Sequence, residues 1–361
     1  MIAVPRSWAD MTPGWVTGAL SRRCPGAQVA EVAAGPVADG TNRRGRLDLT
    51  YSSGSGPPAV FVKLHGRMLH RLALVALGAL STEARLAEAD VHLPIEHPEP
   101  YAGGVEARTL RTVVVTDDVT TSGGRPNDAT RPLSVGEVAA GLAGLAALHG
   151  AYWQKRLAPN LAFLGPWRLG TRWAPVSVAS LARGFTLLRR RGLGRRLPAV
   201  LTPLDLDKQF RASAALAATG AQTVLHGDPH PGNTYALPAG GTGFYDWQLA
   251  RTGHWSHDVG YFLISSLGPD DRTAHQEQLL AGYLDALARA GGEPPPWAAA
   301  WDRYRASPAF GLATWVHTLA GGRFQAADVC VATIERFAAA YSELGTHRSP
   351  VAGPAARRLL P

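Results

Sequence analysis

The spacing of apolar residues changes near residue 134, and this change limits the fold more than any other feature of the chain. Before that point, apolar residues recur at every second position in short runs, which is typical of strands with one buried face. After it, they recur every three to four positions, which is typical of amphipathic helices. The sequence therefore predicts an α+β protein, with a β-rich part followed by a mainly helical part.

The β-rich part is expected to form an antiparallel sheet with one inserted helix. Gly103 and Gly104 are expected to make the turn between its last two strands. The expected strands lie at 28–37, 47–51, 59–65, 98–102 and 112–116, with helices at 12–23 and 68–90.

The helical part begins after a polar stretch at 119–133 that is rich in glycine and proline, which predicts a linker. Ser134 and Glu137 then form a capping box at the start of a helix. We expect an N-terminal lobe at 1–118, a hinge or linker at 119–133 and a C-terminal lobe at 134–361. Further helices are expected at 176–191, 205–219, 270–291 and 296–345, interrupted by short β segments at 223–227, 233–237 and 243–247.

Composition favours a well-packed protein in a reducing compartment. Hydrophobic residues make up 46% of the 361 residues and charged residues 18%, which is enough apolar material for a large core. The two cysteines, Cys24 and Cys330, cannot build a disulfide framework, and no C-x-x-C pair is present for zinc. Neither a signal peptide nor a run of about 18 apolar residues is found. We expect a cytoplasmic protein with no membrane partner.

Positive charge is concentrated in the second half of the chain. The net charge is +8, and residues 151–361 hold 22 basic against 14 acidic residues. Such a cluster can bind nucleic acid, but no aromatic residues are interleaved with it, so a solvated helix end is favoured and no nucleic-acid partner is expected. The densest run contains Arg189, Arg190, Arg191, Arg195 and Arg196.

A hairpin carries the residues with the clearest chemistry. Residues 226–233 read HGDPHPGN, and twelve residues later 246–248 read DWQ. A hairpin returns its two ends to within bonding distance, so Asn233 and Asp246 are expected to meet, with Asp228 on the loop that leads to them. Oxygen ligands of this kind suit Mg²⁺, which prefers one or two carboxylates together with phosphate oxygens and water. A further aspartate that does not bind metal can accept a proton from a hydroxyl.

These two motifs, H-G-D-x-H-x-x-N and D-W-Q, resemble the phosphotransferase superfamily of aminoglycoside, choline and ecdysteroid kinases. The resemblance implies a bilobal protein-kinase-like fold and extends over about residues 28–345. Weaker matches to this superfamily occur elsewhere in the chain, in the same order along the sequence as in the family. They are Lys63 on an apolar strand, Glu83 on the next helix, VVVTDDV at 113–119 before the adenine-holding hinge, the helix at 145–153, and Asp258 in the segment that braces the catalytic loop.

The resemblance implies an ATP-dependent small-molecule kinase that uses Mg²⁺. Asp228 would be the base or orienter for the acceptor hydroxyl, and Asn233 and Asp246 would be metal ligands. Lys63, paired with Glu83, would hold the α and β phosphates. The strand that runs into the hinge places Asp117 among the cofactor-binding residues.

Two details of the resemblance concern the surrounding loops. His226 and His230 would hold their loop by hydrogen bonds. The expected glycine-rich loop, DGTNRRGR, contains only Gly40 and Gly45, which leaves Arg43 and Arg44 as possible phosphate contacts.

Three alternatives remain open from the sequence. A metal-dependent hydrolase could use the histidines and aspartates between 226 and 258, although Pro229 and Pro231 break a strand there. A non-catalytic kinase-like binding module would need a lost catalytic residue, and none is missing. A protein kinase shares the D-x-x-x-x-N spacing, but Gly227 stands where that family has arginine, and no A-P-E-like segment follows Asp246.

The expected acceptor is a small hydroxylated molecule. Because the second half of the chain is positively charged, we expect a neutral or weakly charged acceptor rather than a multiply charged aminoglycoside.

Overall fold

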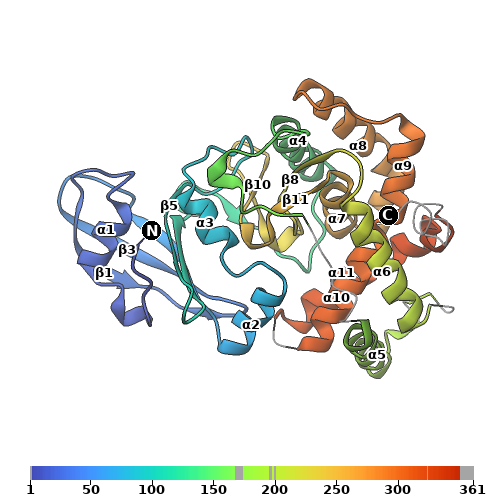
Figure 1. Ribbon diagram of the computed structural model, residues 1–361, viewed down its shortest axis with the longest axis horizontal. Helices are drawn as coiled ribbons and strands as arrows, with labels where there is room; N and C mark the ends of the chain where they lie inside the picture. The colour runs from blue at the N-terminus through green and yellow to red at the C-terminus, as the bar shows by residue number, and fades with distance from the viewer. Residues whose placement is uncertain (1, 167–173, 195–196, 199–200, 323, 350–361) are drawn as a thin grey trace.

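An antiparallel sheet forms one end of the molecule, and helices form the other (Figure 1). The computed structural model describes residues 2–166, 174–194, 197–198, 201–322 and 324–349. Neighbouring strands of the sheet follow the order β1-β3-β4-β6-β5, with β2 paired to β3. The strands are β1 (Gln28–Ala34), β2 (Ala38–Asp39), β3 (Arg43–Ser53), β4 (Ala59–Leu64), β5 (Pro100–Glu106) and β6 (Arg111–Asp117).

Alternation along β4 decides which of its side chains enter the core. Val60, Val62 and Leu64 are buried in a cluster that also contains residues of helix α1 (Pro13–Leu20). Because side chains alternate across a strand, Phe61 and Lys63 face the opposite side, where they line a cavity. The apolar neighbours of Lys63 thus fix the direction in which its ammonium group points.

The expected helix at 68–90 is wrong in one respect, because it is two helices. The first, α2 (Met68–Ala76), ends in a Schellman motif: Gly78 has φ +65°, its N–H bonds the carbonyl of Val75, and the N–H of Ala79 bonds that of Leu74. The second, α3 (Thr82–Glu88), begins a few residues later. The apolar spacing continues across the break, so periodicity alone does not reveal it.

The expected turn at Gly103 and Gly104 is also wrong, because both residues lie within β5 and the chain reverses at 107–110. Gly103 serves packing instead. A Cβ atom at this position would stand 1.9 Å from the carbonyl oxygen of Ala84 on α3. The missing side chain therefore lets α3 lie directly against β5.

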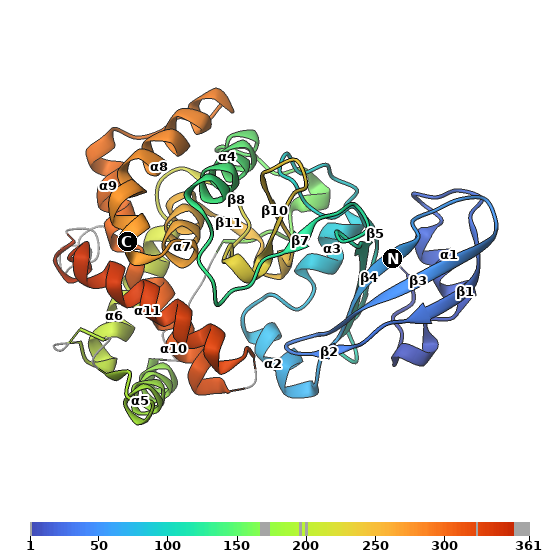
Figure 2. The ribbon, with the colours of Figure 1, turned by 180° about the vertical axis from the view of Figure 1, so that it is seen from behind.

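The helical lobe contains the other elements (Figure 2). The expected helix at 296–345 is three helices, because Pro308 starts a new one and Gly322, with φ +66°, ends it. The expected helices before it are confirmed. The helices are α4 (Val135–Ala151), α5 (Ala174–Arg190), α6 (Pro203–Ala217), α7 (Ser256–Ser266), α8 (Pro269–Arg289), α9 (Trp297–Ala306), α10 (Pro308–Gly321) and α11 (Ala327–Glu343).

Short strands flank the H-G-D-x-H-x-x-N and D-W-Q motifs. The expected hairpin of β9 (Thr234–Ala236) and β10 (Thr242–Phe244) is present, and β7 (Arg125–Pro126) pairs with β9. Sequence reasoning missed that β8 (Gln222–Leu225) pairs with β11 (Arg251–His254). The loop with Asp228 and the D-W-Q segment therefore lie between two small ladders that fix both ends.

The segment at 119–133 is bound to the helical lobe. In addition to the β7–β9 pairing, the buried Arg336 of α11 donates to the backbone carbonyls of Ala129, Thr130 and Ser265.

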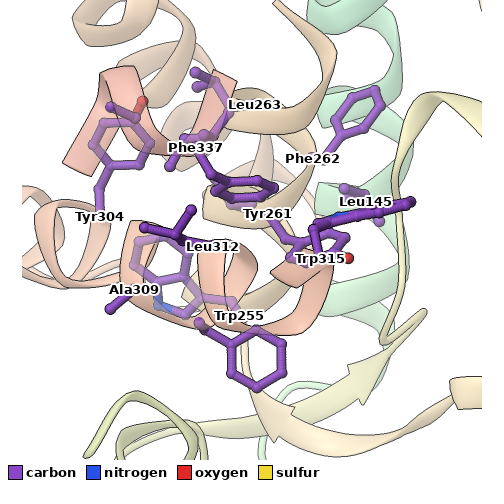
Figure 3. Packing of buried hydrophobic residues seen from close by; sticks show 14 of the residues in the cluster. Leu145, Trp255, Tyr261, Phe262, Leu263, Tyr304, Ala309, Leu312, Trp315 and Phe337 are labelled. Carbon is purple, nitrogen blue, oxygen red and sulfur yellow. The ribbon is translucent and has the colours of Figure 1, made fainter. Parts of the chain in front are cut away.

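Aromatic residues of α7 and α10 form much of the core of this lobe (Figure 3). Tyr261 and Phe262 of α7 pack in one cluster with Leu312 and Trp315 of α10 and Phe337 of α11. In the described part of the chain, we find no helix with the length and apolar character to cross a bilayer.

Candidate active site

Lys63, Glu83 and Asp246 form a buried ion-pair triad. The ammonium nitrogen of Lys63 lies 2.6 Å from Oε2 of Glu83 and 2.7 Å from Oδ1 of Asp246. The side chains of Lys63 and Glu83 are only 10% and 13% exposed. Burial lowers the pKa of Lys63, but the carboxylates of Asp246 and Glu83 outweigh it and raise that pKa. The lysine is therefore a fixed cation in the cavity.

Asp246 lies two residues after the end of β10, in a backbone conformation that few side chains adopt, with φ +66°. Burial raises the pKa of its carboxyl, but the Lys63 ammonium outweighs burial and holds that pKa below its usual range. The next N–H, that of Trp247, donates to Oε1 of Glu83 at 3.2 Å. The strained turn is thus held by the same glutamate that positions the lysine.

The loop that carries Asp228 is anchored by Asp258 of α7. Its two carboxylate oxygens accept from the backbone N–H groups of His226 at 2.7 Å and Gly227 at 3.0 Å. His149 of α4 contacts the same carboxylate at 3.3 Å. Gly227 has φ +87°, and a Cβ there would stand 2.0 Å from the carbonyl oxygen of Leu249. Only glycine fits this turn without displacement of the backbone.

Asp228 and Asn233 lie together on the loop that leads to the hairpin. The amide nitrogen of Asn233 donates to the backbone carbonyl of Asp228 at 2.9 Å and to its Oδ2 at 3.2 Å. Burial, reinforced by the charge of Asp246, raises the pKa of Asp228 to about 8, although hydrogen bonds from Tyr261 and Asn233 and the nearby Arg251 oppose the rise. The carboxyl is therefore able to hold a proton near neutral pH.

The residues around Asp246 fit a magnesium ion. Lys63 uses one carboxylate oxygen of Asp246, and Asn233 uses its amide nitrogen for Asp228. A carboxylate oxygen and an amide oxygen are left over, and both Asp246 and Asn233 line the same cavity. One or two such protein ligands, completed by phosphate oxygens and water, are what Mg²⁺ requires.

Two cavities meet at this triad. The first, of about 580 Å³, contains Phe61, Glu83 and Val114, together with Asp117 at the end of β6. The second, of about 800 Å³, contains Asp228, His230 and Asn233 and extends toward α2 and α10. Both cavities are lined by Arg44, Lys63, Gly232, Asp246 and Gln325.

The histidines of the motif region are engaged in internal hydrogen bonds. His226 contacts the carbonyl of Tyr245, His257 that of Gly227, and His254 the hydroxyl of Ser256. Burial lowers the pKa of His230 to about 3, and its Nδ1 accepts from the N–H of Gly232. Among the residues that the structure describes, no group of three or more His, Cys, Asp or Glu side chains could hold a metal ion. The zinc cluster of the hydrolase alternative is therefore not formed there.

Sequence reasoning missed several residues of the site. Tyr261 lines the second cavity and hydrogen-bonds Asp228, and the buried Arg251 lies close enough to influence the charge of Asp228. Asn42, in the loop between β2 and β3, donates to Gln248 at 3.2 Å and so connects the two lobes. For the contact between Asn42 and Gln248, the sequence offered one signal, the glutamine of the D-W-Q motif. The others depend on tertiary packing.

The described arginines that the sequence singled out lie in two different places. Arg44, on β3, lines both cavities. Arg189 and Arg190 end α5 and are exposed, as is Arg191. Arg195 and Arg196 lie outside the described residues.

The family follows from a comparison of the sequence. The family described as "Phosphotransferase enzyme family" matches residues 44–307, which is more than half of the chain. The protein belongs to this family of phosphotransferases. Comparison with curated protein sequences found no significant match.

Solved structures match the chain at low sequence identity. A choline kinase from Cryptosporidium parvum Iowa II matches with a TM-score of 0.52 and 11% identity, over 93% of this chain and 92% of that one. A macrolide 2′-phosphotransferase from Brachybacterium faecium matches with a TM-score of 0.43 and 17% identity, over 88% of this chain and 95% of that one. The match to the choline kinase shows that the chain has the bilobal kinase-like fold expected from the sequence.

Proposed function

We propose that the protein transfers the γ-phosphoryl group of ATP to a hydroxyl of a small-molecule acceptor. One observation carries the proposal: Lys63 and Asp246 line both cavities, whereas Asp228 lines only the second. Phosphate-binding groups thus lie where the cavities meet, and a proton acceptor lies on one side of them. This division is what a reaction between a nucleotide and an alcohol requires.

The first cavity supplies the nucleotide site in this proposal. Val114 and Phe61 offer apolar surface for a base, and Asp117, at the end of β6, lies where the hinge begins. Lys63 would contact the α and β phosphates, held in place by Glu83. The buried position of the lysine strengthens that contact, since charges interact more strongly away from water.

Asp228 would act on the acceptor. As the acceptor oxygen attacks the γ-phosphorus, the bond to the β-γ bridging oxygen breaks and ADP leaves. The hydroxyl proton passes to a carboxylate oxygen of Asp228. Asn233 donates to this carboxylate and so orients it.

Asp246 and Asn233 would hold Mg²⁺. The bound ion would neutralise charge on the β and γ phosphates. Asp246 is suited to this task because its pKa is depressed, so it stays ionised throughout the neutral range.

Calorimetry of nucleotide binding tests the proposal. Lys63→Ala is expected to weaken Mg·ATP binding at least tenfold, because the variant loses a buried cation. Asp246→Ala is expected to abolish the dependence of binding on Mg²⁺. Lys155→Ala, which removes an exposed lysine that bonds only the carbonyl of Ala151 among the described contacts, serves as the control. Equal Mg·ATP affinity in the wild type and both site variants would contradict the proposal.

A further inference from the structure

The far end of the second cavity is uncharged. Beyond the catalytic loop, its described lining comes from α2, α6, α7, α10, the turn after α10, the loop between β2 and β3, and the residues that follow Asp246. Four charged side chains appear in the described lining of the cavity, namely Arg44, Lys63, Asp228 and Asp246, and all four lie at the phosphate end. Of the two histidines in the lining, burial lowers the pKa of His317 to about 4 and that of His230 to about 3. Burial thus disfavours the charged form of both rings.

The histidine and threonine side chains of α10 in this wall are already partnered, whereas the buried indole N–H of Trp315 has no hydrogen-bond partner among the described residues. The ring nitrogens of His317 contact the hydroxyls of Ser177 and Ser180, at 3.2 and 3.0 Å. Thr314 and Thr318 donate to helix carbonyls one turn earlier. A ligand in this part of the cavity therefore meets few free hydrogen-bonding groups, and apolar contact is the main interaction on offer.

Helix α2 and Phe324 form the opposite wall. Arg71 fixes α2 to the first lobe by bonds to the carbonyls of Gly66 and Thr109, and Leu74 and Leu77 line the cavity. His70 contacts the ring of Phe324 at a centroid distance of 5.1 Å. In both ribbon views α2 lies beside the end of α10 (Figures 1 and 2).

From this arrangement, and on the basis of the proposed function, we propose that the acceptor is an uncharged alcohol with a large apolar body. Its hydroxyl would meet Asp228, and its body would lie between α2 and α10. Leu77 and Phe324 would be the contacts that determine specificity.

A small or multiply charged cation fits this cavity less well. The two carboxylates of the lining are already paired, Asp246 with Lys63 and Asp228 with Asn233, and Arg44 and Lys63 repel a cation. The aromatic rings of the lining pack against different partners. Phe210 packs on Phe310, Trp315 on His230 and Phe324 on His70. A cation cage needs rings that converge on one ligand.

The test uses a panel of acceptors with the full-length protein, ATP and Mg²⁺. The uncharged alcohols are glycerol, geraniol, farnesol and decyl glucoside, and the cations are choline and kanamycin. ADP release coupled to product detection gives kcat/KM, and calorimetry in the presence of a non-hydrolysable ATP analogue gives acceptor affinity. We expect kcat/KM to rise at least tenfold from glycerol to the larger alcohols, and to exceed the values for both cations.

Two variants, one within α2 and one at its C-cap, locate the contact. Leu72 and Leu77 are each 49% exposed, but only Leu77 is part of the cavity lining. Leu77→Asp is expected to lower kcat/KM for farnesol roughly tenfold, whereas Leu72→Asp is expected to leave kcat/KM for farnesol unchanged. Phe324→Ser provides a second variant on the other wall.

The outcomes separate the acceptor class from the phosphotransfer itself. Higher kcat/KM for choline or kanamycin than for every uncharged alcohol would overturn the proposed acceptor class but not the proposed phosphotransfer. The same holds if a protein that binds Mg·ATP neither binds nor phosphorylates the apolar alcohols, or if Leu72→Asp and Leu77→Asp behave alike. Absence of Mg·ATP binding in the wild type would overturn both proposals.

Discussion

At the scale of single residues, Asp228 couples the site to pH. Its folded-state pKa is about 8, raised from 3.8 by burial and by Asp246. Between these two values the folded protein binds more protons than the unfolded chain, so this carboxyl makes stability fall as pH rises. The group that we propose as the base is therefore held at a cost to the folded state, which is common at catalytic sites.

Asp228→Asn should remove this pH dependence. We expect the variant to gain stability over the wild type as pH rises from 5 to 8, by more than about 1 kcal/mol, since one pKa unit corresponds to ~1.4 kcal/mol. Urea unfolding across this pH range measures it. Asp271→Asn, at an exposed position on α8, is the control. Parallel stability curves for Asp228→Asn and the wild type would show that the carboxyl is not destabilised by burial.

Glycine can be required by a positive φ angle or by a lack of space for a Cβ atom, and Gly227 and Gly240 allow these two requirements to be tested separately. Their φ angles are +87° and +83°, but a Cβ at Gly227 meets the carbonyl oxygen of Leu249, whereas a Cβ at Gly240 meets nothing within 4 Å. Gly240→Ala should cost about 1–2 kcal/mol of unfolding free energy, the usual penalty of the left-handed conformation. Gly227→Ala should cost clearly more and reduce turnover, because the loop must move. Equal thermal shifts in the two variants would mean that the loop tolerates the side chain.

At the scale of elements, the position of α3 depends on Gly103. Tight packing against β5 sets the helix that brings Glu83 to Lys63. Gly103→Ala should push α3 away from the sheet and weaken Mg·ATP binding by roughly tenfold. Because both changes act on one ion pair, the effects of Gly103→Ala and Glu83→Gln on affinity should be less than additive. Additive effects in calorimetry would show that Gly103 acts elsewhere.

Elements were predictable where the local signal was complete. The capping box at Ser134 and Glu137 correctly places the start of α4, and the hairpin of β9 and β10 is found where the strands were expected. The break after α2 was missed because apolar residues occupy both sides of Gly78 and keep the helical spacing. The β8–β11 pairing was missed because four-residue strands leave little alternation to detect.

The candidate site, too, was predicted from the sequence only in part. Lys63 pairs with Glu83 as the resemblance implied, whereas its ion pair with Asp246 was not predicted, and Asp228 lies beside Asn233. Tyr261 could not be predicted, because it reaches Asp228 from a buried face of α7 and its neighbours in sequence are also buried. The contribution of Leu77 to the cavity is likewise a product of how the two lobes meet.

At the scale of the whole molecule, the cleft is the place where both lobes contribute. Lys63 of the sheet bonds Asp246 of the helical lobe, Glu83 accepts from Trp247, and Asn42 donates to Gln248. A nucleotide and an acceptor bound on either side of this junction would face each other across Lys63 and Asp246. The central claim is that Asp228 serves the acceptor and not the nucleotide.

The most direct test compares turnover and nucleotide affinity in Asp228→Asn, with the best acceptor of the alcohol panel. Transfer of label from [γ-³²P]ATP gives kcat, and calorimetry gives the Kd of Mg·ATP. We predict that kcat falls by about 10²–10⁴, the usual contribution of a general base, while Kd changes less than about twofold because Asp228 lies outside the first cavity. A variant that keeps a third of the wild-type turnover, or one that loses turnover only through weaker Mg·ATP binding, would contradict this account.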